Sequence, residues 1–253
     1  MAKKLAEYHS IPSDDVHPKK KSELVDKLRH YLHLLNGTNP QLRERLQLVQ
    51  SQSMDVLSTI KNAVGLQSNS PSLDSLESEF DYSWSQLSND LDQMETIFDE
   101  NWSNVPVVLC HNDTQSRNFL LEKQTNILHM VDFEHCFNNF YLFDIENYFV
   151  EFAGLGSSPD WPKKYPSKER RKNFLAEYVK HARFFSHTYN DDELDQLCDR
   201  AHRLIALTHL YWSLWAILQS MINPQALSQF DYVTYSKSRF HQYKLHKDTF
   251  FNI

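Results

Sequence analysis

Apolar residues in the first part of the chain recur every three or four positions, the spacing at which side chains share one face of a helix. This spacing predicts helices over residues 2–9, from the capping residue Ser22 onwards, and over 39–64. The polar stretch 67–72 has the composition of a loop, and it precedes a long amphipathic helix over 73–98. We therefore expect this first part to be helical.

The pattern changes after Val105, where short apolar runs rich in β-branched residues replace the helical spacing. Runs at 106–110, 118–121 and 127–131 are the good strand candidates, and a polar turn at 123–125 joins the last two. Helical spacing then resumes and predicts further helices over residues 145–153, 167–187, 191–221 and 230–247.

These elements predict a mainly α fold with a small β-hairpin. We expect one domain with three regions: a helical region over 1–104 that includes a variable insert at about 50–79, a hairpin region over 105–153, and a second helical region over 154–253. A lone hairpin is only marginally stable, so its presence in a helical chain calls for a reason beyond packing.

Glycine is scarce, with four residues in a chain of 253 where average usage of about 7% gives roughly four times as many. The four positions, Gly37, Gly65, Gly154 and Gly156, form neither G-x-G-x-x-G nor G-x-x-x-x-G-K-[ST]. A Rossmann fingerprint, a P-loop and a protein-kinase glycine-rich loop are therefore excluded from this sequence.

Charge and cysteine usage narrow the class of protein further. The formal net charge of −7 opposes attraction to nucleic-acid phosphates or anionic lipid. Cys110, Cys136 and Cys198 are odd in number and have no C-x-x-C spacing, as expected of reduced thiols. The N-terminus lacks the apolar segment of an export signal, and polar residues interrupt the longest apolar tract at 204–221. We expect a cytoplasmic protein that neither binds nucleic acid nor inserts stably into a membrane.

The predicted hairpin carries candidate chemistry. Residues 111–118 have the form H-x-D-x-x-x-x-N, with His111, Asp113 and Asn118 at the fixed positions, and Asp132 follows the second strand. Phosphoryl transfer needs a carboxylate that accepts the proton of the attacking hydroxyl, and oxygen ligands that hold Mg²⁺ across the phosphates of ATP. In this interpretation Asp113 is the catalytic base, and Asn118 and Asp132 are the metal ligands.

Each of these residues also has a structural interpretation. An aspartate after a strand is commonly a turn former or helix cap, and a histidine beside a strand commonly bonds to the backbone. The conjunction of H-x-D-x-x-x-x-N, an apolar strand and a following Asp-Phe pair favours the catalytic interpretation more than either half does alone.

A family resemblance rests on four motifs: Leu-Cys-His-Asn-Asp with Asn118 (109–118), Val-Asp-Phe-Glu (131–134), Asn-Asn-Phe (138–140) followed by Phe-Asp-Ile (143–145), and Tyr-Phe-Val-Glu-Phe (148–152). Together they resemble the C-terminal lobe of choline and ethanolamine kinases, a protein-kinase-like fold shared with aminoglycoside phosphotransferases. Segments 209–219 and 230–240 are similar to the last helices of that family, so the resemblance covers nearly the whole chain.

The resemblance implies a role for each matching residue. Asp113 is then the catalytic base, Gln115 its partner in the catalytic loop, and Asn118 and Asp132 the Mg²⁺ ligands. His111, Glu134 and Asp144 would support the site structurally, and Glu151 would contact the ammonium group of the substrate.

The residues themselves favour a site for an ammonium group. Glu151 lies seven residues after Asp144, two turns along the same helix face, so both carboxylates can face one cleft. An aromatic wall would add about 0.5–2 kcal/mol per good cation–π contact, although such rings are as commonly core residues. The candidate rings are those of Trp212, Trp215, Phe230 and Tyr235.

The function that the resemblance implies is ATP-dependent phosphorylation of ethanolamine to phosphoethanolamine, the first step of the CDP-ethanolamine route to phosphatidylethanolamine. Mg²⁺ and ATP are the implied cofactors, a small amino alcohol is the implied partner, and a homodimer is left open. Segments 2–11, 152–154 and 239–243 look more like ethanolamine kinases, whereas Gln115 looks more like choline kinases. His135, the pair Tyr141-Leu142 and Glu146 depart from the family pattern.

The largest departure lies at the start of the chain. Family members begin with a lobe whose sheet, phosphate-covering loop and ATP-positioning lysine precede a helix that ends in an A-x-x-H segment, and this chain starts inside that helix at Met1–His9. We therefore expect the nucleotide lobe to be missing and the chain alone to be poorly active or inactive, because positioning is most of the catalysis of phosphoryl transfer.

Two other functions compete with an ethanolamine or choline kinase. A small-molecule kinase of the aminoglycoside phosphotransferase type shares the H-x-D-x-x-x-x-N motif but does not need Glu151 or the tryptophans. A non-catalytic, amine-binding regulatory form would keep the helical lobe without turnover. A panel of alcohol substrates separates the first alternative, and amine binding without ATP hydrolysis identifies the second.

Overall fold

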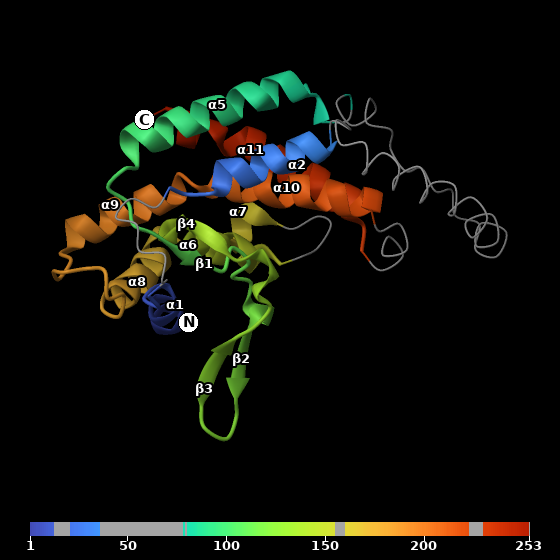
Figure 1. Cartoon of the computed structure of the whole chain (residues 1–253). Helices are drawn as coiled ribbons and strands as arrows, with labels where there is room; N and C mark the ends of the chain where they lie inside the picture. The colour runs from blue at the N-terminus through green and yellow to red at the C-terminus, as the bar shows by residue number, and fades with distance from the viewer. Residues whose placement is uncertain (13–20, 36–77, 79, 155–159, 223–229, 253) are drawn as a thin grey trace. The chain divides into compact units, whose positions relative to one another are not determined.

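The computed structural model describes residues 1–12, 21–35, 78, 80–154, 160–222 and 230–252 (Figure 1). These residues form two compact units, each of which is described by itself. The first unit comprises Met1–Leu24, Ile97–Thr208 and His246–Ile253, and the second comprises Val25–Thr96 and His209–Leu245.

Helix α6 (Tyr141–Val150) is the central helix of the first unit, because nine of its ten residues are buried. It is apolar on most sides, as expected of a helix inside a core, and its polar residues therefore need partners. Helix α9 packs against α6, α8 packs against α9, and α1 packs against α8. The bounds of these helices are Ala2–His9 (α1), Lys168–Val179 (α8) and Asp191–His202 (α9), and a short helix α7 spans Trp161–Lys164.

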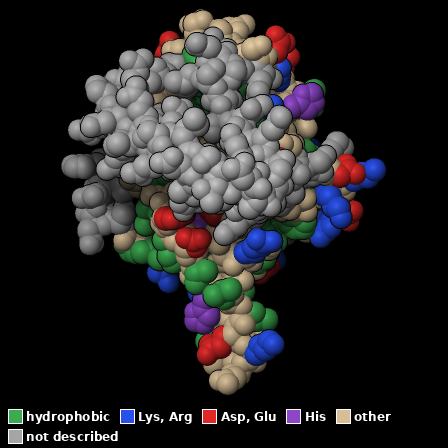
Figure 2. Space-filling model, turned by 90° about the vertical axis from the view of Figure 1, so that its right-hand side faces the viewer, with side chains coloured by type: hydrophobic (Ala, Val, Ile, Leu, Met, Phe, Trp, Pro, Cys, Tyr) green, Lys and Arg blue, Asp and Glu red, His purple; other side chains and the backbone are tan. Residues whose placement is uncertain are grey.

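Two separate two-stranded antiparallel sheets belong to the first unit. Strand β1 (Val107–Cys110) pairs with β4 (Phe137–Phe140). Strand β2 (Phe119–Glu122) pairs with β3 (Ile127–Met130), and the short loop between them makes these two strands a hairpin. The hairpin projects from its unit, and hydrophobic side chains lie at its surface (Figures 1 and 2). Leu121 of β2 is about half exposed.

The second unit contains most of four helices that run side by side (Figure 1). The guanidinium of Arg29 on α2 pairs with Asp92 and Glu95 of α5 at 2.7 and 2.9 Å. The hydroxyl of Tyr243 on α11 donates a hydrogen bond to Asp90 of α5, and Ser213 of α10 bonds to Ser236 of α11. The bounds of these helices are Leu24–Leu35 (α2), Trp84–Asn101 (α5), Ile205–Ile222 (α10) and Tyr232–Phe251 (α11).

The predicted mainly α fold is confirmed, but the strand prediction was incomplete. The three predicted strands form, yet the sequence analysis missed β4, and β1 pairs with this missed strand. Strand β4 reads Phe-Asn-Asn-Phe, and asparagine is uncommon in strands. Here the Asn139 side chain accepts bonds from the Ser22 hydroxyl and the Phe140 backbone N–H, both at 2.8 Å, which satisfies a buried amide.

Most predicted helices are present, with altered ends. Helix α1 has the predicted bounds, and Ser22 accepts the backbone N–H of Leu24 at 3.2 Å, close to its predicted capping role. The helix predicted over 167–187 ends at Val179, and the one predicted over 191–221 is interrupted at residues 203–204. A break at Asp81, whose φ is 48°, interrupts the long helix predicted over 73–98.

Some sequence predictions fall outside the described residues: the helix over 39–64, the loop at 67–72 and, apart from residue 78, the insert at about 50–79. All three cysteines are free thiols, as expected. In the part of the chain that the structure describes, no helix combines the length and apolar character that a bilayer crossing requires.

Candidate active site

The H-x-D-x-x-x-x-N motif forms the loop between β1 and β2, in the first unit. His111, Asn112, Asp113 and Asn118 are all buried. The loop ends in a short 3-10 turn, Ser116–Asn118, and Asn118 directly precedes β2. A polar loop this deeply buried requires a dense set of hydrogen bonds.

Asp144 of α6 supplies much of that set. Its Oδ2 atom accepts the backbone N–H of His111 at 2.7 Å, and its Oδ1 atom accepts that of Asn112 at 2.6 Å. The carboxylate is fully buried, so water does not compete for these hydrogen bonds. These bonds show how Asp144 could provide the predicted structural support: they hold the backbone of the two residues just before Asp113.

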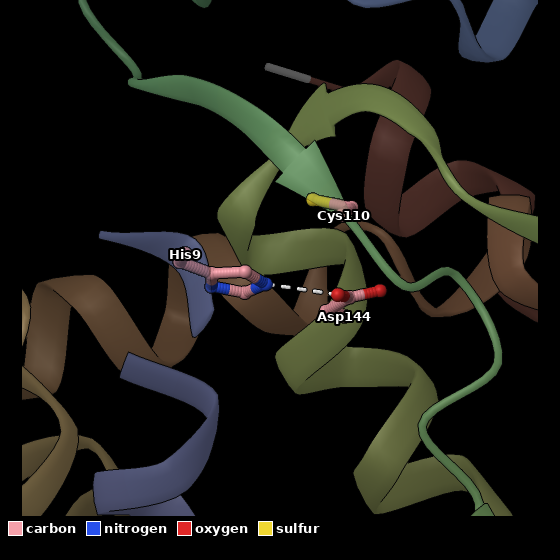
Figure 3. Close-up of side chains that lie close together, drawn as sticks. All are labelled: His9, Cys110 and Asp144. Carbon is pink, nitrogen blue, oxygen red and sulfur yellow. Dashed lines mark hydrogen bonds and ion pairs between the residues drawn. The ribbon is translucent and has the colours of Figure 1, made fainter. Parts of the chain in front are cut away.

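His9 at the end of α1 adds a third bond to the same carboxylate. Its Nε2 atom lies 2.9 Å from Asp144 Oδ2 (Figure 3). Its Nδ1 atom lies 2.6 Å from the Tyr178 hydroxyl. The sequence analysis did not select His9, because the 135 positions between it and Asp144 leave no local signal. Helices α1, α6 and α8 thus meet at this buried group.

His9, Cys110 and Asp144 place ligand atoms within 4.8 Å of one another, a spacing that a metal ion could use (Figure 3). Both carboxylate oxygens of Asp144 already accept N–H groups, which occupies the positions a metal would need. Burial, with a smaller contribution from Asp144, raises the pKa of the Cys110 thiol well above its usual value, which disfavours the thiolate ligand. The chemistry of this group therefore fits a structural network better than a metal site.

Asn147, one turn after Asp144, holds the other side of the loop. Its Oδ1 atom accepts the backbone N–H of Thr114 at 2.8 Å, and the Thr114 hydroxyl donates to the Asp144 carbonyl at 2.6 Å. The backbone on both sides of Asp113 is therefore bonded to one buried helix.

The side chain of Asp113 is oriented by two amides. Gln115 Nε2 donates to Asp113 Oδ2 at 2.9 Å, and Asn118 Nδ2 donates to the same oxygen at 2.7 Å. The other oxygen, Oδ1, makes no hydrogen bond within the described residues. The predicted pairing of Gln115 with Asp113 is present, and it uses Oδ2, so that Oδ1 keeps its capacity to accept a hydrogen bond.

His111 connects the loop to the end of β3. Its Nε2 atom lies 2.8 Å from the carbonyl oxygen of Val131, which can only accept, so Nε2 carries the proton. Its Nδ1 atom then accepts the backbone N–H of Asp113 at 3.3 Å. The backbone N–H of Val131 donates to the Asn118 carbonyl at 3.0 Å, which brings Asp132 to the end of the loop that carries Asn118.

Asp132 has a left-handed backbone, with φ 67° and ψ 64°. Aspartate adopts this region more readily than most residues, and such conformations cost about 1–3 kcal/mol and gather at functional sites. Its side chain is exposed and forms no hydrogen bond or ion pair in the described part of the chain. The carboxylate is therefore available to an external cation.

The oxygen atoms present suit Mg²⁺. Because the Asn118 amide nitrogen donates to Asp113, its oxygen is free to act as a ligand. An amide oxygen and a carboxylate are hard oxygen donors, which Mg²⁺ prefers over nitrogen or sulfur. Asn118 and Asp132 are therefore the residues of this chain that would hold the ion.

Two neighbours of Asp132 complete this edge of the site. Glu134 is exposed, and its Oε1 atom lies 3.6 Å from His135 Nε2. Burial lowers the pKa of His135, and the carboxylates of Asp113, Glu134 and Asp132 act against that shift. The sequence analysis treated His135 only as a departure, but its ring lies within electrostatic reach of all three carboxylates.

Glu151 follows α6 directly, in a 3-10 turn over Glu151–Ala153. It is half-buried, and its Oε2 atom is enclosed. Asp144 therefore lies within the helix and Glu151 just beyond its end, rather than both within one continuous helix as predicted.

The predicted aromatic residues belong to the second unit and form a chain of edge-to-face contacts. Ring centroids are 5.2 Å apart for Trp212 and Trp215, and 5.2 Å apart for Phe230 and Tyr235. Tyr232, which the sequence analysis missed, joins the two pairs, at 5.8 Å from Trp215 and 4.9 Å from Phe230. The close spacing of aromatic residues at positions 230, 232 and 235 is the sequence signal that could have identified Tyr232.

These rings differ in how much of their surface a ligand could reach. Trp212 and Tyr235 are buried, and the guanidinium of Arg239 lies 4.9 Å from the Tyr235 ring centroid and donates to its hydroxyl at 2.9 Å. Trp215 and Phe230 are half-buried. Because Glu151 belongs to the first unit and the rings to the second, their expected association around one amine stays a prediction.

Comparisons with known proteins agree with the resemblance. A family model described as choline/ethanolamine kinase matches residues 1–244. The chain is 39% identical over 150 residues to the probable ethanolamine kinase A of Dictyostelium discoideum, a match that covers 59% of this chain and 41% of that protein. It is 28% identical over 246 residues to the probable choline kinase 1 of Arabidopsis thaliana, which covers 94% of this chain and 64% of that one.

A solved structure of Plasmodium vivax ethanolamine kinase shares the fold. Its TM-score with this chain is 0.69 at 23% identity, and the match covers 98% of this chain and 59% of the other. The chain thus spans less than two thirds of the length of each of these relatives. Because the family model matches residues 1–244 of its 253 residues, the chain belongs to the choline/ethanolamine kinase family.

Proposed function

We propose that this chain carries the catalytic and substrate-binding residues for transfer of the terminal phosphoryl group of ATP to the hydroxyl of ethanolamine. The product is phosphoethanolamine, and the reaction is the first step of the CDP-ethanolamine route to phosphatidylethanolamine. The observation that carries the proposal is Asp113, whose Oδ2 is fixed by Gln115 and Asn118 while Oδ1 faces no partner in the described residues.

Asp113 Oδ1 orients the substrate hydroxyl and accepts its proton as the oxygen attacks phosphorus. Gln115 keeps the carboxylate in that orientation, and the bonds from Asp144 and Asn147 keep the loop backbone from moving. Asn118 and Asp132 hold Mg²⁺, which when bound neutralises charge on the phosphates of ATP.

Glu151 binds the ammonium group. Water screens the charge of a half-buried carboxylate less than that of an exposed one, so Glu151 attracts an ammonium ion and can accept its charge-assisted hydrogen bonds. A primary ammonium donates hydrogen bonds to such an oxygen, whereas a quaternary ammonium relies on aromatic faces. We therefore favour ethanolamine over choline, and the name of the Dictyostelium relative agrees with this choice.

We expect the isolated chain to turn over slowly. Its sequence holds no glycine-rich loop to cover the phosphates, and positioning supplies most of the rate enhancement in phosphoryl transfer. Robust turnover by the purified chain would contradict this expectation without affecting the assignment of Asp113.

The test is the formation of phosphoethanolamine by the purified chain with Mg²⁺ and ATP. Asp113→Asn is expected to reduce the rate by about 10²–10⁴-fold, because it removes the proton acceptor while preserving shape. Asp192→Asn, an exposed residue in the first turn of α9, is the matched control and is expected to leave the rate unchanged. A rate that does not depend on Asp113 would refute the proposal.

The same assay separates the competing functions. A higher kcat/KM for choline than for ethanolamine would reassign the substrate, and turnover only with other alcohols would favour the aminoglycoside phosphotransferase type. Calorimetric binding of ethanolamine without any ATP-dependent product would identify a non-catalytic form.

A further inference from the structure

A cavity of about 550 Å³ lies in the first unit, between the end of α8 and the start of α9. It is lined mainly by the irregular segment 180–189 that joins these helices, with Ala176 and Val179 of α8 and Leu194 of α9 as apolar walls. None of the residues of the candidate active site lines it. The sequence predicted helix over most of this segment, so the cavity could not be anticipated.

The lining has an unusual charge for this protein. Lys180, His181, Arg183 and His187 line the cavity, and the described lining includes no aspartate or glutamate. The chain as a whole carries a net charge of −7, so a cavity with basic residues alone runs against its composition. The basic side chains of this lining that carboxylates do not pair attract negatively charged ligands.

Neighbouring carboxylates hold three of the four basic side chains from outside the lining. Glu177 pairs with Lys180 at 3.2 Å and with His181 at 2.9 Å, and Glu193 pairs with His187 at 3.4 Å. These pairs offset part of the positive charge and also restrict the side chains to defined positions. A ligand then meets cations that are already partly ordered, which lowers the entropy cost of binding.

Arg183 is the basic residue of this lining without an ion pair to any described residue. Its backbone N–H donates to the hydroxyl of Ser10 at 2.9 Å, which ties the segment to the end of α1. A guanidinium fixed at its backbone and free at its head is suited to bidentate bonding to a phosphate or carboxylate.

Aromatic rings supply an adjoining surface for an organic group. The rings of His187 and Tyr189 stack at 4.5 Å with an interplanar angle of 17°, and Phe185 contacts Tyr189 at 5.2 Å. Ser186 and Thr188 add hydroxyl groups to the lining. The cavity thus combines cations, hydroxyls and ring faces.

We propose that this cavity binds a phosphate monoester, with the phosphate group on Arg183 and Lys180 and the organic group against Phe185 and Tyr189. A monoester carries a charge of about −1.5 to −2 at pH 7, so the Arg183 guanidinium attracts it more strongly than it attracts a singly charged carboxylate. The site is distinct from the proposed phosphoryl-transfer site, and the inference does not depend on that activity.

Phenyl phosphate is a suitable probe because it joins a phosphate to one ring. Binding is measured on the full chain carrying Asp113→Asn, without Mg²⁺ or ATP, by two-dimensional amide NMR. We expect saturable shifts of amides within residues 180–189, and an affinity for inorganic phosphate roughly threefold or more weaker, because it lacks the ring contact. Equal affinities would overturn the assignment to a monoester.

Variants locate the charge. Arg183→Gln is expected to weaken binding by about tenfold, since it removes a charge-assisted bidentate contact. Arg170→Gln, an exposed arginine on α8 outside the cavity, is the matched control and is expected to change the affinity by less than about twofold. Unchanged binding in Arg183→Gln, or no saturable shift up to about 10 mM, would overturn the proposal.

Discussion

His111 Nε2 donates a hydrogen bond to the carbonyl oxygen of Val131 at 2.8 Å, across 20 positions of sequence. This bond spans the base of the projecting hairpin and links the loop of Asp113 to the residue before Asp132. A two-stranded hairpin is marginally stable by itself, so its position depends on bonds at its base. His111 therefore controls where Asp132 lies relative to Asp113.

His111→Ala is expected to raise the Mg²⁺ concentration needed for half-maximal activity more than it raises the KM for ethanolamine. The change leaves the Val131 carbonyl and the Asp113 N–H without a partner, and it should lower the free energy of unfolding by about 1–3 kcal/mol. Mg²⁺ titration of the rate and denaturant unfolding measure the two effects.

His129→Ala, on the exposed strand β3 of the same hairpin, is the matched control, and both quantities should stay close to wild type. Equal effects from the two variants would mean that the His111–Val131 bond does not position Asp132.

Asp144→Asn is expected to lower the free energy of unfolding by about 3 kcal/mol or more, because the buried carboxylate accepts N–H groups from His111, Asn112 and His9. In the asparagine variant an NH₂ group replaces one carboxylate oxygen. This NH₂ group cannot accept a hydrogen bond, so it would face an N–H donor that has lost its acceptor. Urea unfolding followed by circular dichroism measures the loss.

Asp199→Asn serves as the control, since it breaks an exposed pair with Lys168 that contributes about 0–1 kcal/mol. If Asp144→Asn does not fold, Asn147→Ala provides a milder change to the same loop. Its loss of the Thr114 bond should cost about 1–2 kcal/mol, and a stability equal to wild type would show that α6 does not hold the loop.

The sequence was most informative where the chemistry is local. Asp113, Gln115 and Asn118 are close neighbours in one loop, and the motif together with the family resemblance identified all three. The bonds that Gln115 and Asn118 donate to Asp113 were not predicted and come from the structure. Asp132 was identified because a strand and turn of ordinary length bring the chain back to the loop. Its left-handed backbone was not predicted, because no glycine marks the position.

Contacts between distant segments could not be read from the sequence. His9 bonds to Asp144 although 135 positions of sequence separate them. Strand β4 was missed because asparagine, present at positions 138 and 139, is uncommon in strands. The Asn139 side chain bonds to Ser22, Phe140 and Asn112, and these bonds outweigh the propensity. Tertiary hydrogen bonds, not local pattern, therefore determine these parts of the site.

Glu151→Gln is expected to weaken ethanolamine binding by roughly 10- to 100-fold, because a neutral amide loses a charge-assisted bond of about 1.5–3 kcal/mol to the ammonium group. Calorimetry without ATP measures this effect directly and does not depend on turnover. Glu169→Gln, exposed in the first turn of α8, should bind ethanolamine as the wild type does. Undiminished binding by Glu151→Gln would remove Glu151 from the substrate site.

The stability of the protein should fall as the solution becomes mildly acidic. Burial lowers the pKa of His246, with a further lowering by His202 and an opposing effect of Glu146. In the unfolded chain His246 has an ordinary histidine pKa of about 6.5, so it binds a proton more readily there than in the folded chain. The stability contributed by neutral His246 is complete above about pH 6.5 and is lost as the pH falls below it.

His246→Gln removes this titration and should flatten the decrease in the free energy of unfolding between about pH 7.5 and pH 5. A residual slope is expected, because burial lowers the pKa of His135 in the same direction. His241→Gln, exposed on the same helix α11, should retain the full slope. Parallel curves for wild type and His246→Gln would show that the burial of His246 makes no contribution to the loss of stability in acid.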